Sequence, residues 1–229
     1  MRRRWIPGLL VAAIAGPAAP AAIVDTGPTH RFCLSSIGGR FDSDRRPDTA
    51  VVYSTRRRCD TVGARSWYLV VRLAGGSVLR RALVQDRPAF SGEGDFGCES
   101  VCAVRSAPDF NRDGRHEIEV SLQQGASQEQ RGIYAVVRGE LRRLAGRPGG
   151  KRFSLSYGGS LTHGAYVVCR TRGNQHLVVA VGWGIADKAH AAVREEIYRL
   201  EGLRFRLIAT RTQQMSARVI PPRVSGRSC

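Results

Sequence analysis

The stretch "SWYLVVRLAGGSVLRRAL" (66–83) has two parallels later in the chain, "GIYAVVRGELRRLAG" (132–146) and "EIYRLEGLRFRLIAT" (196–210). Each holds a tyrosine-bearing apolar run, a turn with glycine, and a run in which arginine and leucine interleave. The three tyrosines, Tyr68, Tyr134 and Tyr198, recur at intervals of about 65 residues. Period-two alternation and β-branched residues around a glycine turn predict β-hairpins, so the sequence indicates one sheet module copied three times.

A second pair of strands precedes each hairpin. "CLSSIGGRFDSDRRPDTAVVY" (33–53) and "CAVRSAPDFNRDGRHEIEVSL" (102–122) both read as a short strand, an acidic loop and an alternating strand, and "AYVVCRTRGNQHLVVAVGW" (165–183) repeats this with a shorter loop. Each copy therefore predicts four strands, in the first copy roughly 31–36, 49–54, 66–73 and 77–84. The copies span 31–90, 98–150 and 160–210, and a tail follows at 211–229.

One segment is ambiguous between helix and strand. "IADKAHAAVREEIYRL" (185–200) carries alanines that favour a helix, and three of its apolar residues could line one helical face. The third copy requires a strand at this position. We therefore expect a loop followed by a strand.

Four-stranded antiparallel units repeated at this spacing are typical of propeller blades, which bury their faces against neighbouring blades. The expected fold is all-β: a β-propeller-like array of about three four-stranded antiparallel blades in one domain, 22–229. Known propellers have about four to eight blades. The tail strand in "MSARVIPPRVSG" (215–226) could close the ring against the N-terminal strand, two chains could complete one ring as a homodimer, or the copies could form a different sandwich.

Residues 1–21 have the features of a secretory signal peptide. Three arginines precede an apolar stretch too short to span a bilayer, and Ala19-Pro20-Ala21 offers small residues for cleavage. No later stretch is apolar enough to predict a membrane span. The mature protein is expected to be secreted or periplasmic.

An exported chain with an even number of cysteines predicts disulfides. Six cysteines allow 15 connectivities. Proximity and tethering of the chain end favour Cys33–Cys59, Cys98–Cys102 and Cys169–Cys229. A zinc site is the competing interpretation, and it lacks a CxxC pair and suitably spaced histidines.

The net charge of +17 raises the question of an anionic partner. The arginines are scattered rather than gathered on one helix, so no specific nucleic-acid partner is predicted. The densest basic cluster, Arg56, Arg57 and Arg58, is a candidate contact for an anionic polymer or another envelope ligand, with a solvated loop as the alternative interpretation.

The loop 109–117, here the second acidic loop, carries a candidate metal site. Asp109, Asn111 and Asp113 stand two residues apart, Gly114 lets the chain reverse, Arg115 could supply a carbonyl and Glu117 returns as a further carboxylate. Hard cations such as Ca²⁺ take oxygen ligands in this way. An EF-hand is excluded because its twelfth position needs glutamate and holds Val120. A polar turn without metal remains the alternative.

The pattern Asp-x-Asn-x-Asp-Gly-x-x-Glu-Ile-x-Val resembles the FG-GAP repeat of integrin α-subunit propellers and the similar VCBS-type repeat. The resemblance implies blade-like repeats, a structural calcium ion in the turn, and a role in adhesion, ligand binding or scaffolding.

The other two copies depart from the pattern. In the first acidic loop (40–48), Asp42, Asp44 and Asp48 match the motif, and Arg40 and Arg45 replace its first aspartate and its glycine. A guanidinium there would compete with a cation. The third copy keeps the motif's glycine and no carboxylate. Calcium is therefore expected in the second loop and disfavoured in the first.

No catalytic motif is present in the sequence. His116-Glu117 begins an HExxH motif that Val120 breaks, and the acid pairs around Asp95 are better explained as a glycine-rich turn. The expected function is a secreted, non-catalytic binding or interaction module for a glycan, a protein or an anionic polymer. A polysaccharide hydrolase or lyase and a structural envelope component are the alternatives.

Overall fold

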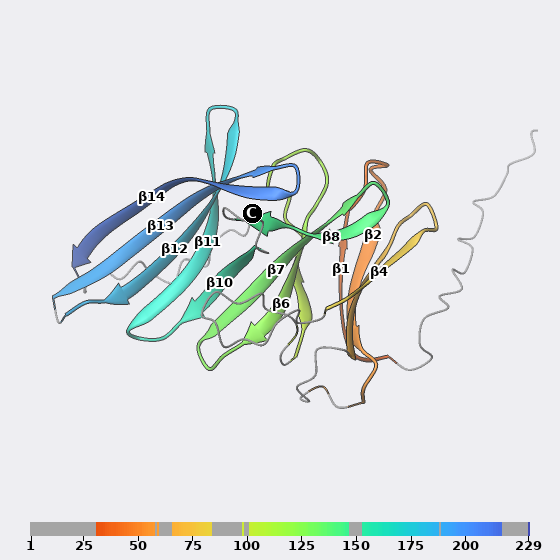
Figure 1. Cartoon of the computed structure of the whole chain (residues 1–229), viewed down its shortest axis with the longest axis horizontal. Coiled ribbons are helices and arrows are strands. Elements are labelled where there is room, and N and C mark those ends of the chain that lie inside the picture. Colours follow the sequence, from red (N-terminus) through yellow and green to blue (C-terminus); the bar gives the residue numbers. More distant parts are fainter. Residues whose placement is uncertain are drawn as a thin grey trace, which may run out of the picture.

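The computed structural model describes residues 31–57, 59, 66–83, 98, 101–146, 153–187, 189–216 and 229 (Figure 1). These residues form two antiparallel sheets of four and ten strands, the larger with one short parallel pair. Among them no helix is long and apolar enough to cross a membrane. The expected signal peptide (1–21) and the acid pairs around Asp95 lie outside the described residues.

The first copy forms the four-stranded sheet by itself. Its strands, in the order β1-β2-β3-β4, are β1 (Phe32–Gly39), β2 (Asp48–Ser54), β3 (Trp67–Arg72) and β4 (Val78–Ala82). The central strands β2 and β3 are rich in valine and tyrosine, residues that suit a pleated, half-buried surface. All four strands were predicted from the sequence.

The larger sheet contains the second and third copies. The second copy supplies β5 (Ala103–Ser106), β6 (Ile118–Gln124), β7 (Gln128–Val137) and β8 (Glu140–Arg143), and the third supplies β11 (His163–Arg172), β12 (Gln175–Ile185), β13 (His190–Glu201) and β14 (Arg204–Ser216). Two further strands follow the second copy's meander: β9 (Ala145–Gly146), at the end of that copy, and β10 (Ser154–Gly159), between the second and third copies in sequence. The segment 185–200 is mostly strand, as expected.

The three tyrosines occupy equivalent places. Tyr68 lies in β3, Tyr134 in β7 and Tyr198 in β13, each the third strand of its four-stranded meander. Each pairs with the second strand on one side and the fourth on the other. Each predicted copy therefore forms a four-stranded antiparallel meander with its tyrosine in the third strand.

The expected array of separate blades is wrong for the second and third copies. β10 pairs antiparallel with β7 on one side and with β11 on the other, so it joins the two copies edge to edge in one sheet (Figure 1). No closed propeller is formed among the described residues. The physical reason is that β10, from a segment between the predicted copies, pairs with residues 128–132 of β7 and with Gly164 and Ala165 of β11, backbone groups that a separate blade would leave unpaired.

The last strand of the larger sheet pairs within that sheet and not with the N-terminal strand. β14 pairs in parallel with β9, which follows directly after β8, the partner of β7. The expected closure against the N-terminal strand is absent from the described part of the chain, where β1 pairs with β2. The tail residues Met215 and Ser216 belong to β14; 217–228 lie outside the described residues.

The buried apolar side chains of the described residues form three clusters. The first joins the two sheets, with Leu69 and Val71 from the small sheet against Val120 and Leu122 from the large one. The second lies within the large sheet and includes Phe110, Phe153, Leu155, Tyr198 and Phe205. The third covers the opposite face of β12 and β13, with Val179, Val181, Val193 and Ile197. The first copy thus packs face to face on the second, as a blade would, while the third continues the sheet of the second.

Candidate cation-binding loops

The second acidic loop connects β5 to β6 and is closed by its own carboxylates. The Asp113 and Gly114 N–H groups donate to the two Asp109 oxygens at 3.1 and 2.9 Å. The Phe110 N–H donates to Glu117 Oε2 at 2.9 Å. Gly114 has φ +87°, a left-handed conformation that glycine adopts without strain. The residues predicted from spacing therefore lie in one turn, held by hydrogen bonds to backbone N–H groups.

The first acidic loop, between β1 and β2, has the same internal arrangement. The Phe41 N–H donates to Asp48 Oδ2 at 2.7 Å, as Phe110 does to Glu117. The Asp44 N–H donates to Asp42 Oδ1 at 2.9 Å, as Asp113 does to Asn111. Arg45 takes the place of Gly114 and has φ +61°. The loop keeps its shape despite this arginine, so it is less degenerate than its sequence indicated.

The first loop brings three carboxylates together. One oxygen from each of Asp42, Asp44 and Asp48 lies within 4.8 Å of the others, a spacing that suits a metal ion. Asp48 is buried, and its second oxygen accepts the Ala74 N–H at 2.8 Å. The structure therefore places a carboxylate cluster in the loop where the sequence disfavoured calcium.

In the second loop, negative charge accumulates around Glu117. This carboxyl group is buried, and burial raises its pKa to about 8, with Asp113 and Asp109 adding repulsion. The hydrogen bond from the Phe110 N–H acts in the opposite direction. A cation bound in this turn would lower the free-energy cost of burying the Glu117 charge and of placing it near Asp113 and Asp109.

In both loops an arginine lies against the central aspartate. Arg115 Nη2 lies 2.6 Å from Asp113 Oδ2, while its backbone N–H donates to Oδ1 at 2.9 Å. Arg46 holds Asp44 in the same way, with its side chain at 2.7 Å and its backbone N–H at 2.8 Å. Arg115 was predicted only as a source of a carbonyl. Its side chain instead acts as an internal cation, and a metal ligated by Asp113 would have to displace it.

Each loop is fixed to a core by its phenylalanine. Phe41 lies in the first cluster and Phe110 in the second, and both are almost fully buried. The Phe110 ring meets Phe205 edge to face at 5.4 Å. The backbone N–H of each phenylalanine also donates to the last carboxylate of its loop, Asp48 or Glu117. Each phenylalanine therefore connects its loop to the apolar core.

The two loops meet at the junction of the sheets. The Arg40 N–H donates to His116 Nδ1 at 2.9 Å, and the His116 N–H donates to the Arg40 carbonyl at 2.7 Å. Gly39 also lies here, where an added Cβ would come within 2.6 Å of the Phe41 ring. Equivalent loops from two copies are therefore joined directly.

The structure also has a buried polar network that the sequence analysis missed. Glu119 of β6 is 2% exposed and accepts hydrogen bonds from Tyr157 of β10 (2.6 Å), Arg131 of β7 (3.0 Å) and Ser106 of β5. The Arg131 guanidinium also stacks 3.8 Å from the Tyr157 ring centroid. Burial and the neighbouring Glu119 raise the pKa of Tyr157. The network ties four adjacent strands together. In the sequence, Glu119 alternates with the apolar residues Ile118 and Val120. This pattern is typical of a side chain that faces solvent, so it gave no indication that Glu119 is buried.

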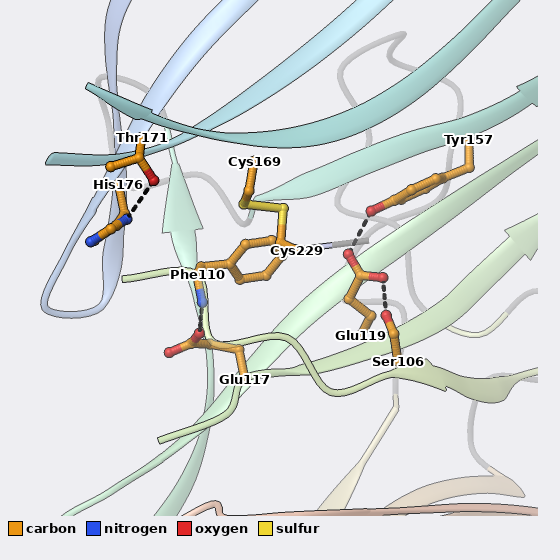
Figure 2. The surroundings of a disulfide bond; sticks show 9 residues. All are labelled: Ser106, Phe110, Glu117, Glu119, Tyr157, Cys169, Thr171, His176 and Cys229. Atoms are coloured by element: carbon orange, nitrogen blue, oxygen red, sulfur yellow. Dashed lines mark hydrogen bonds between the residues drawn. A yellow bond between two sulfur atoms is a disulfide. The ribbon is translucent and has the colours of Figure 1, made fainter. Parts of the chain in front are cut away.

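Figure 2 shows Glu119 of this network with Tyr157 and Ser106, together with the disulfide that anchors the C-terminal residue. Cys169 of β11 bonds to Cys229, which packs against the second apolar cluster, the one that contains Phe110. The other two disulfides are Cys33–Cys59 and Cys98–Cys102. These are the three pairs that the sequence favoured, and such bonds are typical of oxidising extracellular compartments.

The predicted anion contact is partly described. Arg56 and Arg57 are exposed after β2, and the Arg56 N–H donates to Ser54 Oγ at 3.0 Å. Arg58 lies outside the described residues. The contact described for this cluster is therefore a hydrogen bond from a backbone N–H within its own turn, and it does not involve the acidic loops.

Comparisons with protein families, curated proteins and solved structures give no match for this chain. The likeness to FG-GAP repeats therefore remains a prediction from the motif.

Proposed function

We propose that this chain is an exported, non-catalytic binding or interaction module in which a divalent cation, calcium in the first instance, stabilises the junction between its two sheets. The observation that carries the proposal is the pair of matching acidic loops joined through Arg40 and His116. Oxygen-only ligands favour a hard cation, and Ca²⁺ tolerates the irregular geometry of a turn.

The residues that would hold the ion are the oxygen-bearing side chains of the two loops. In the first loop these are Asp42, Asp44 and Asp48. In the second loop they are Asp109, Asn111, Asp113 and Glu117, with the Arg115 carbonyl as the backbone ligand predicted from the sequence. When bound, the ion would supply positive charge to turns whose carboxylates repel one another.

A cation at this position suits a scaffolding or binding role. It would fix the angle between the small sheet and the large sheet, and exposed arginines would then face an extracellular partner in a constant arrangement. A glycan, an envelope protein or an anionic polymer fits the strongly positive chain. Assay of the purified protein on polysaccharides separates this proposal from a hydrolase or lyase.

The test is a melting curve of the oxidised mature chain in Ca²⁺, in Mg²⁺ and in chelator. Calcium is expected to raise the melting temperature of the native chain by several degrees, because a ligand that binds only the folded state stabilises it. Asp44→Ala and Asp113→Ala should each reduce this calcium-dependent increase. Asp187→Ala, in the exposed β12–β13 turn, is the matched control.

The arginines supply a second readout. Removing the internal cation with Arg115→Ala or Arg46→Ala should tighten calcium binding measured by titration calorimetry, even if the ion-free protein becomes less stable. An unchanged melting temperature in calcium, together with no binding heat in either arginine variant, would refute the cation part of the proposal.

A further inference from the structure

β14 has a long free edge. It pairs with β13 from Arg204 to Ser216, but on its other side only Arg204 and Phe205 pair, with β9. No strand in the described part of the chain pairs with the outer side of 206–216. Leu207 and Ile208 are 42% and 46% exposed there. In Figure 1 this strand forms the outer border of the large sheet.

Two other strand borders in the described structure lie against a neighbour. β1 lies against β5, where the Val104 N–H donates to Ser35 Oγ at 2.9 Å. β4 lies against β8, where Arg81 Nη1 donates to the Leu141 carbonyl at 3.2 Å. No strand in the described part of the chain covers 206–215 of β14 in this way, and an exposed edge of this length is a template for another strand.

The usual protection of an edge is confined to the first part of this stretch. Ile197 pairs with Ala209 and Tyr198 with Leu207, so Ile208 is an extra, bulged residue. Bulges and arginines discourage pairing, and Arg206 lies beside this one. From Ala209 onward the ladder with β13 is regular, and the sequence "ATRTQQMS" contains one charge, no proline and no glycine.

The same stretch is complementary to itself. A two-fold axis perpendicular to the sheet keeps each face on its own side, so residues that meet must project from the same face. With the axis at Thr212, that threonine meets its copy, Arg211 meets Gln213, and Ala209 meets Met215. No like charges meet. Ala209 and Met215 both pack against the third apolar cluster, so the two clusters would become continuous.

We propose that the stretch 209–215 of β14 pairs antiparallel with the same stretch of a second copy, which joins two ten-stranded sheets into one across a two-fold axis at Thr212. Backbone hydrogen bonds supply the attraction, and the Arg211–Gln213 pairing sets the register. A second copy is the occupant because the strand matches its own reverse in charge and in apolar face. The proposal does not depend on calcium binding.

The test is sedimentation of the oxidised mature chain over a range of concentrations. We expect a reversible dimer. Gln213→Arg would place arginine opposite Arg211 at two symmetry-related positions, and should raise the dimer dissociation constant about tenfold. Gln213→Glu should lower it by a similar factor. Gln175→Arg, at an exposed position beside the β11–β12 turn, adds the same charge away from the edge and should leave the dimer unchanged.

Melting curves verify that the variants are folded. A protein that is monomeric at every concentration overturns the proposal. The edge of β14 would then be a candidate site for pairing with a strand of a different protein. A dimer that responds equally to Gln213→Arg and Gln175→Arg also overturns it, because the interface must then lie elsewhere or depend only on total charge.

Discussion

Arg40 and His116 form two hydrogen bonds across the boundary between the sheets. The Arg40 N–H donates to His116 Nδ1 at 2.9 Å, and the His116 N–H donates back to the Arg40 carbonyl at 2.7 Å. Arg40 follows β1 and His116 precedes β6, so each sits in the acidic loop of its own copy. The imidazole thus couples two loops that are 76 residues apart in the chain.

Replacing His116 with alanine should lower the unfolding free energy by about 1 kcal/mol, the usual net value of one hydrogen bond. The variant keeps the backbone bond from its own N–H and loses the imidazole acceptor. Urea unfolding measures the change. His116→Asn is the control, because its side-chain oxygen can accept from the Arg40 N–H. An equal loss in both variants would show that ring packing, not the hydrogen bond, stabilises the junction.

The buried Glu117 makes stability depend on pH when cations are absent. Its pKa rises from 4.5 to about 8 on folding, because burial and the nearby Asp113 and Asp109 disfavour the charge. A raised carboxyl pKa contributes stability that is complete below pH 4.5 and is lost as the pH rises through about 8. In chelator, unfolding experiments at several pH values should therefore show this loss.

Glu117→Gln isolates the effect, since the amide oxygen can still accept the Phe110 N–H and does not titrate. The variant should match the native chain near pH 4.5 and exceed its stability at pH 8 to 9 in chelator. A native chain whose difference from Glu117→Gln is constant across this range would contradict the raised pKa.

The Glu119 network should be costly to break. Glu119→Ala leaves Tyr157 and Ser106 without their acceptor and Arg131 without one of its two carboxylates, so we expect a loss of roughly 3 kcal/mol in urea unfolding. Glu201→Ala removes an exposed partner of Arg199 and should change stability by about 0.5 kcal/mol or less. Similar losses in the two variants would mean that Glu119 contributes no more than a surface ion pair.

Much of the fold was predictable because the module is local. Alternation, glycine turns and the tyrosine spacing depend on neighbours in sequence, and they predicted four strands in each copy. The equivalence of Asp48 and Glu117 was also predictable, since each is the last acid of its loop and is followed by an alternating strand. These features follow from short-range geometry.

The way the copies assemble was not predictable from the repeat. β10 has little alternation, with "SLSYGG" as its sequence, yet its backbone groups pair with both β7 and β11. Backbone pairing is nearly independent of side-chain identity, so no motif marks the strand that fuses two copies. Glu119 was missed for a related reason: its partners lie on β5, β7 and β10, and burial of a carboxylate depends on that tertiary arrangement.

The pairing of Cys169 with Cys229 can be tested by mutational coupling. The bond closes a loop of 60 residues, and the entropy it removes from the unfolded chain corresponds to about 4 kcal/mol of stability. Cys169→Ala and Cys229→Ala each abolish the same bond, so each should lose about this amount in urea unfolding, and the double variant should lose little more. Cys33→Ala belongs to a different bond, so combining it with Cys229→Ala should give nearly additive losses. Additivity in the first pair together with strong coupling in the second would require a different connectivity, and would detach the C-terminal residue from β11.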